Sequence, residues 1–200
     1  MPTELPVRDS EPHERADAAR NRRRIVAAAE RLFAREGVAN VSMDAIAAEA
    51  GVGKGTLFRR FGDRASLART LISEREAGFQ DDLIRGAPPL GPGAPPVERL
   101  VAFGTGLIRF KAEHSDLFCA AENGQDGVRL RGSPYLSYRQ HVRMLIEEAD
   151  PGADADYLAD VLLAALSAEL ISYLSGTAAM PLARVERGFE DLVRRLLSAP

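Results

Sequence analysis

The chain has 200 residues, 46% of them hydrophobic, and a formal net charge of −3 at pH 7. These values are typical of a globular protein of one or two domains with a sizeable core. We expect no membrane segment, because no apolar run approaches the roughly 18 residues that a spanning helix needs, and no secretory signal, because residues 1–18 lack an apolar core. The single cysteine permits no internal disulfide, which favours a reducing cytoplasm.

The charge is unevenly distributed along the chain. Residues 20–64 hold ten Lys/Arg and five Asp/Glu, a net charge of +5, whereas residues 65–200 hold fourteen basic and nineteen acidic residues, a net charge of −5. A basic segment attached to an acidic body favours contact with nucleic acid through one face only. The alternative, a charged helix surface that is merely solvated, is not excluded by charge alone.

In chain order, the sequence predicts an all-α protein of about nine helices. Residues 1–18 are rich in proline and charge and are predicted to be a mobile tail. A first helix is expected from about Ala18 to Glu36, ended by Gly37. After the segment 41–61 and a helix toward Ile84, the loop GAPPLGPGAPP at 86–96 excludes a helix. Helical periodicity then predicts further helices over 97–113, from Ser115, and over 134–149, 157–175 and 185–197.

The segment from Val41 to Phe61, VSMDAIAAEAGVGKGTLFRRF, predicts a helix-turn-helix. Ser42 is a good N-cap for the first short helix, and Gly51 can take the left-handed conformation that ends it. Leu57 and Phe61 are spaced i, i+4 on the buried side of the second helix. The exposed side of that helix is therefore formed by Lys54, Gly55, Thr56, Phe58, Arg59 and Arg60. The same stretch contains Gly-Lys, but the spacing and the helical context exclude a phosphate-binding loop.

This stretch resembles the DNA-binding domain of TetR-family transcriptional regulators. The segment GVGKGTLFRRF followed by Arg64 matches the family's recognition segment, departing at Gly53, where the family usually has Ser, and at Phe58, where it usually has Tyr. The resemblance implies a helix-turn-helix domain over 19–66 and a ligand-binding and dimerisation domain over 67–200.

The resemblance also assigns roles in DNA binding. It implies that the residues facing the major groove are Lys54, Gly55, Thr56 and Arg59. It implies that the residues along the phosphates are Ser42, Phe58, Arg60 and Arg64, with Arg22 and Arg23 from the first helix. Two subunits paired through residues 157–175 and 185–197 would read a palindromic operator as double-stranded DNA.

A small-molecule effector is the further partner that the resemblance implies. The residues expected to line its site are Phe103, Leu107, Phe110, Phe118, Glu122, Tyr138, His141, Leu166, Glu169 and Tyr173. This mostly apolar set favours a lipophilic ligand, and an inward-pointing Glu122 or Glu169 would favour a lipophilic cation. Glu169 lies on an apolar stripe and could equally face solvent, a dimer interface or a cavity.

Two other functions compete with a ligand-responsive regulator, expected to be a repressor. One is a DNA-binding repressor without an effector. The other is a helical enzyme, but the sequence contains no nucleophile–base pair or cofactor-binding loop, so we expect no catalytic residues and no cofactor. His114 and His141 have no metal-ligand spacing, so no metal site is expected either.

Overall fold

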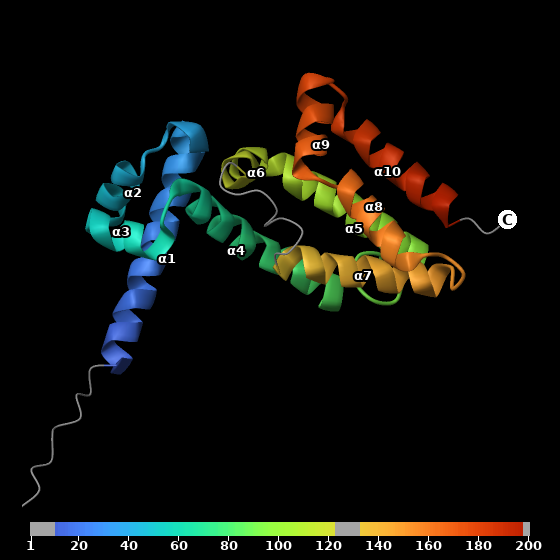
Figure 1. Cartoon of the computed structure of the whole chain (residues 1–200), viewed down its shortest axis with the longest axis horizontal. Helices are drawn as coiled ribbons and strands as arrows, with labels where there is room; N and C mark the ends of the chain where they lie inside the picture. Colours follow the sequence, from blue (N-terminus) through green and yellow to red (C-terminus); the bar gives the residue numbers. More distant parts are fainter. Residues whose placement is uncertain (1–10, 123–132, 198–200) are drawn as a thin grey trace, which may run out of the picture. The chain divides into compact units, whose positions relative to one another are not determined.

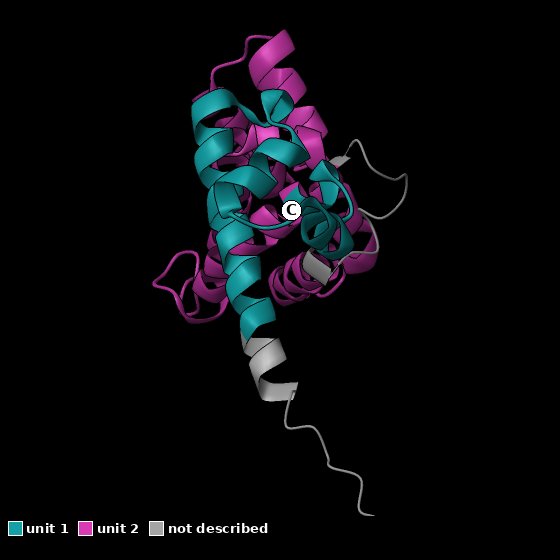
Figure 2. Cartoon of the chain, turned by 90° about the vertical axis from the view of Figure 1, so that its left-hand side faces the viewer, with its two compact units in different colours: residues 1–67 teal, residues 68–200 magenta. Residues whose placement is uncertain are grey.

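The computed structural model describes residues 11–122 and 133–197, with side chains described for 17–121 and 135–197. Its regular elements are all helical within those ranges, which confirms the all-α prediction. The chain forms two compact units, residues 1–67 and residues 68–200 (Figure 2). Each unit is described by itself.

The first unit contains the predicted helix-turn-helix. Its elements are α1 (Glu11–Glu36), a 3-10 turn (Val38–Asn40), α2 (Met43–Ala50), α3 (Lys54–Phe61) and the first turn of α4 (Arg64–Arg85) (Figure 1). α1 begins at Glu11, seven residues before the expected start, so part of the predicted tail is helical. The remainder of that tail, residues 1–10, lies outside the described residues.

The core of the first unit is built from the apolar stripes of these helices. Ile25, Ile46 and Leu57 are fully buried, and α1 packs against α2. Ala28 and Ala47, both buried, let helix backbones approach closely because their side chains are small. The stripes predicted from the sequence are therefore the ones that form the core.

The second unit contains the rest of α4 and six further helices. They are α5 (Pro96–Glu113), α6 (Ser115–Glu122), α7 (Ser133–Ala149), α8 (Ala155–Ala165), α9 (Ala168–Ser172), which continues as a π-helical turn (Tyr173–Thr177), and α10 (Leu182–Leu196) (Figure 1). The helix expected over 157–175 is thus divided. Leu166 ends α8, and the Ser167 hydroxyl caps α9 by accepting a hydrogen bond from the Leu170 amide at 3.1 Å.

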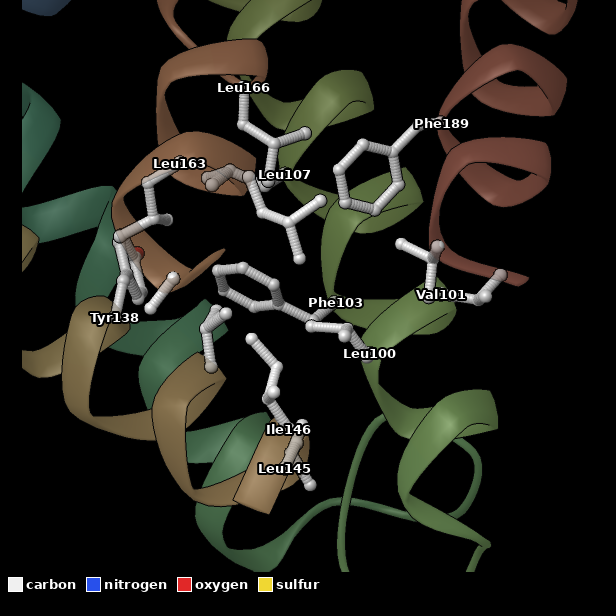
Figure 3. Packing of buried hydrophobic residues seen from close by; sticks show 14 of the residues in the cluster. Leu100, Val101, Phe103, Leu107, Tyr138, Leu145, Ile146, Leu163, Leu166 and Phe189 are labelled. Atoms are coloured by element: carbon white, nitrogen blue, oxygen red, sulfur yellow. The ribbon is translucent and has the colours of Figure 1, made fainter. Parts of the chain in front are cut away.

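α5 is the central helix of the second unit and packs against α7 and α10. Phe103 and Leu107 on α5 are fully buried and lie among side chains of α7, α8 and α10 (Figure 3). A Cβ built on Gly104 would lie 1.8 Å from Cε1 of the buried Phe189. The absence of a side chain at Gly104 is therefore what allows α5 and α10 to pack this closely.

The segment Ala155–Thr177 is long and apolar enough to cross a membrane by length and composition alone, a test that a buried core helix also passes. Its inner face, including Ala159, Leu162 and Ile171, is buried in the second unit. The helical break after Leu166 divides the segment into two shorter helices. Its apolar composition is accounted for in part by the core of the second unit.

Candidate functional site

The helix-turn-helix is held by hydrogen bonds at each of its helix ends. The Ser42 hydroxyl accepts from the Ala45 amide at 3.1 Å and caps α2, as predicted. Gly51 ends α2 in the left-handed conformation, φ 62°, while its amide donates to the Ala48 carbonyl and the Val52 amide donates to the Ala47 carbonyl. This pair of bonds is the Schellman arrangement, which fixes the direction in which the chain leaves a helix. α3 then begins after Gly53, which caps it without a side-chain hydrogen bond.

α3 presents one exposed face that has no packing role within the unit. Lys54, Gly55, Phe58 and Arg59 are all exposed, and Phe58 is 47% accessible although it is a large apolar side chain. A Cβ built on Gly55 would meet no atom within 4 Å. A glycine inside a helix costs about 1 kcal/mol relative to alanine. Because no neighbour within the chain requires a glycine here, the position suits the close approach of an outside partner.

Two of the expected DNA contacts are engaged within the first unit. Lys54 forms an ion pair with Asp44 of α2. Arg64 donates from Nη1 to the Ala39 carbonyl at 2.7 Å, which ties the start of α4 to the turn after α1. Sequence reasoning missed both contacts, because each joins side chains and backbone that are distant along the chain.

The remaining expected DNA contacts are on the surface of the first unit. Arg60 and Arg23 are exposed, whereas Arg22 and Thr56 are half-buried. Arg24, which was not assigned a DNA contact, donates to the Gly51 carbonyl at 3.3 Å and so links α1 to the turn. The arginines of this unit therefore differ in exposure, and Arg24 is also held by a hydrogen bond to the backbone.

The predicted effector residues divide into buried and exposed groups. Phe103, Leu107, Tyr138 and Leu166 are buried in the core of the second unit, while Phe110, Phe118 and His141 are half-buried. Their rings form two groups. Centroids lie 5.4 Å apart for Phe103 and Tyr138 and 5.6 Å for Phe103 and His141, and separately 6.0 Å for Phe110 and Phe118. Phe79 of α4 joins the two groups into one cluster.

Glu169 and Tyr173 do not join this cluster. Glu169 is exposed on α9, and Tyr173 is 55% accessible at the start of the π-helical turn. Both side chains point away from the core because the break after Leu166 changes the helical register that the sequence stripe assumed. The side chain of Glu122, at the end of α6, lies outside the described residues.

The carboxylate that sequence reasoning missed is Glu76 on α4. It is 5% accessible, and burial raises the pKa of its carboxyl above the usual value. Ile72, Phe79 and Leu83 share its helical stripe, so a carboxylate on an apolar face was the signal that could have identified it. Phe79, also not predicted, lies 6.1 Å from Phe103 and 6.2 Å from Tyr138 between ring centroids.

The comparisons with known proteins agree on one family. Residues 25–71 match the family model for bacterial regulatory proteins of the tetR family. An HTH-type transcriptional regulator of Staphylococcus aureus (strain MRSA252) is 29% identical over 159 residues, which cover 80% of this chain and 84% of that protein. These matches support a TetR-family transcriptional regulator.

Two solved structures extend the likeness to the second unit. A TetR-family regulator from Pectobacterium atrosepticum has a TM-score of 0.71 at 22% identity and covers 93% of this chain and 98% of its own. FadR of Thermus thermophilus, a TetR-family repressor in complex with lauroyl-CoA, has a TM-score of 0.67 at 21% identity, covering 86% and 92%. At these identities the likeness establishes the fold alone, an all-α arrangement in two units.

Proposed function

We propose that this TetR-family regulator is a cytoplasmic, homodimeric repressor that binds a palindromic operator and is released from it by a small, mostly apolar molecule. The observation that carries the DNA-binding part is the exposed face of α3. On that face, Gly55 leaves open space beside the exposed Arg59 and Phe58. A Cβ built at position 55 would meet no other atom within 4 Å, so the fold itself does not require a glycine there. Such a helix face is what a recognition helix presents to the major groove.

Base readout in this proposal comes from four residues of α3. The Gly55 backbone approaches the base edges, with Lys54 and Thr56 beside it, and the exposed Arg59 guanidinium can contact guanine in a bidentate manner. Lys54 exchanges its ion pair with Asp44 for DNA. Because that ion pair is exposed, its loss costs little.

Phosphate contacts in this proposal come from residues around the recognition helix. They position the protein without reading the sequence, and they are made by Ser42, Phe58, Arg60, Arg64, Arg22 and Arg23. Ser42 retains its hydroxyl proton as a donor while its oxygen caps α2. Arg64 has further guanidinium donors beyond the one bonded to Ala39. Phe58 can offer only apolar contact to the sugar-phosphate backbone, since it lacks the hydroxyl of the family's usual Tyr.

Exposed apolar side chains on α8, α9 and α10 support a homodimer. Tyr157 is 66% accessible, and Val161, Leu170 and Leu192 are 37–40% accessible. A Cβ built on Gly188, at the middle of α10, would meet no atom within 4 Å, so a second helix could approach there. These side chains lie in the segments 157–175 and 185–197 that were predicted to pair, and a stable pairing buries more than about 1,000 Å² in total.

The aromatic cluster of the second unit supports a lipophilic effector. Phe79, Phe103 and Tyr138 supply ring faces inside the unit, and the half-buried Phe110 and Phe118 extend the cluster to its surface. The Thermus thermophilus relative in complex with lauroyl-CoA carries a long acyl chain in a protein of the same fold. A ligand releases the operator only if it binds one conformation of the dimer better than the other.

Selection of bound duplexes from a random DNA library tests the proposal. The purified chain should enrich a two-fold symmetric site, and Arg59→Ala should relax the preference at one base pair per half-site by about 1–3 kcal/mol. The matched control is Arg60→Ala, which should weaken specific and non-specific duplexes alike. Enrichment of no sequence, or a monomer in sedimentation at micromolar concentration, would refute the proposal.

A further inference from the structure

The second unit contains a buried carboxylate without an ion-pair partner. Glu76 is 5% accessible and is the only buried residue of a charged type among the side chains described. None of the ion pairs among those residues includes it. Lys111 acts on it electrostatically, but the Lys111 ammonium donates to the Leu166 carbonyl at 2.6 Å and lies 5.8 Å from the centre of the Phe118 ring. An ionised carboxylate in such a place is costly unless a cation compensates it.

A tyrosine hydroxyl shares the surroundings of this carboxylate. The Tyr138 hydroxyl is buried and directed at the side chains of Glu76 and Gln80, with which it interacts. One turn further along α7, Nε2 of His141 is buried without a hydrogen-bond partner. Buried polar atoms are normally hydrogen-bonded. The contact region of α4 and α7 therefore holds polar groups among its apolar side chains.

Aromatic rings complete the surroundings of Glu76. Tyr138 and Phe103 lie 5.4 Å apart between ring centroids, and Phe79, three residues after Glu76 on α4, packs against both (Figure 3 shows Tyr138 and Phe103). Phe110 stacks on Phe79 at 6.3 Å and is only half-buried, so the cluster reaches the surface of the unit. Ring faces attract cations, and more strongly where water is excluded.

We propose that Glu76 and Tyr138 anchor the polar end of the effector, and that this end is an organic ammonium cation whose apolar remainder contacts the rings of Phe79, Phe103 and Phe110. The inference rests on the proposed function, in which the effector binds within the second unit. An ammonium group compensates the Glu76 carboxylate and contacts ring faces at once. A neutral molecule gains only the apolar contacts, and an anion is repelled by the ionised carboxylate.

Calorimetric titration with two compounds of the same shape tests the charge of the ligand. Benzyltrimethylammonium carries a cationic nitrogen where neopentylbenzene carries a carbon, so the pair differs in charge alone. We expect the cation to bind at least about tenfold more tightly than the neutral compound. Equal binding of both, or no binding of the cation up to about 10 mM, would overturn the inference.

Variants of the full-length protein test the residues. Glu76→Gln should lower the affinity for the cation at least about tenfold and change the affinity for the neutral compound by no more than about twofold. The control, Glu169→Gln, alters an exposed carboxylate of the same unit and should change neither affinity. Should Glu76→Gln fail to fold, Tyr138→Phe provides a second test. It keeps the ring, removes the hydroxyl that faces the carboxyl, and should weaken the cation but not the neutral compound. Binding of the cation that is unchanged in the folded variants would exclude the assigned site.

Binding and release are measured separately, so the two proposals can fail separately. Glu76-dependent binding of the cation without release of the selected operator would refute the proposed ligand response and leave the site intact. Release of the operator by neutral compounds alone would refute the cation site and leave the ligand response intact.

Discussion

The His141 imidazole makes the folded second unit sensitive to acid. Its burial, and to a lesser extent the positive charge of Arg99, lower the pKa of His141 from 6.5 to about 4. The ring lies against Phe103, and its Nε2 is buried without a hydrogen-bond partner. The native state therefore holds His141 neutral under conditions in which the unfolded chain protonates it.

The direction of the effect follows from proton binding. Between pH 6.5 and pH 4 the unfolded state binds more protons at His141 than the native state, so the free energy of unfolding falls as the pH falls through this window. A pKa difference of this size contributes about 2 kcal/mol between pH 7 and pH 4.5, at 1.36 kcal/mol per pKa unit. Glu76 acts in the opposite direction, because its raised pKa favours the native state as the pH falls. The contribution of His141 must therefore be isolated by substitution.

Urea unfolding followed by circular dichroism at pH 7 and pH 4.5 measures this contribution. His141→Phe keeps an aromatic ring and removes the titrating nitrogen. Between pH 7 and pH 4.5, the free energy of unfolding should therefore fall by about 2 kcal/mol more in the wild-type protein than in this variant. The comparison at each pH cancels the contributions of Glu76 and His114, which both proteins retain. Equal losses in the two proteins would refute the burial argument for His141.

Three further substitutions test other parts of the structure. Gly104→Ala should destabilise the second unit by about 1–3 kcal/mol in thermal unfolding, because the new methyl group would overlap the buried Phe189 ring; an unchanged Tm would contradict this. Gly55→Ala should leave Tm unchanged or higher, because its Cβ meets open space, while weakening operator binding in a fluorescence anisotropy titration; full affinity would exclude close backbone approach to the bases. Asp44→Asn releases Lys54 and should increase affinity for any duplex and steepen its salt dependence, and an unchanged slope would show that Lys54 makes no phosphate contact.

Local signals in the sequence predicted the helix-turn-helix well. The Ser42 hydroxyl caps α2 by accepting from the Ala45 amide, and Gly51 ends α2 in the left-handed conformation. Each of these contacts joins residues within a few positions of one another. Residue type and spacing are therefore sufficient to predict them.

Long-range contacts explain what the sequence did not predict. The break between α8 and α9 falls inside an apolar stripe, and the Leu166 carbonyl at the break accepts a hydrogen bond from Lys111, fifty-five positions earlier in the chain. The pairing of Lys54 with Asp44 and of Arg64 with the Ala39 carbonyl also depends on tertiary packing. Helical periodicity reports which face is apolar but not which distant group lies against it.

The choice between Glu169 and Glu76 shows the limit of periodicity as a guide to the effector site. Both carboxylates lie on apolar stripes, but the break before α9 leaves Glu169 exposed, while the uninterrupted α4 carries Glu76 into the core. α4 is also the helix whose first turn, with Arg64 bonded to Ala39, belongs to the DNA-binding unit. In the proposed site, the ligand contacts a helix whose residues are divided between the two units. If ligand binding lowers the affinity for the operator by a given factor, operator binding must lower the affinity for the ligand by the same factor. The reason is that both changes express one coupling free energy between the two sites.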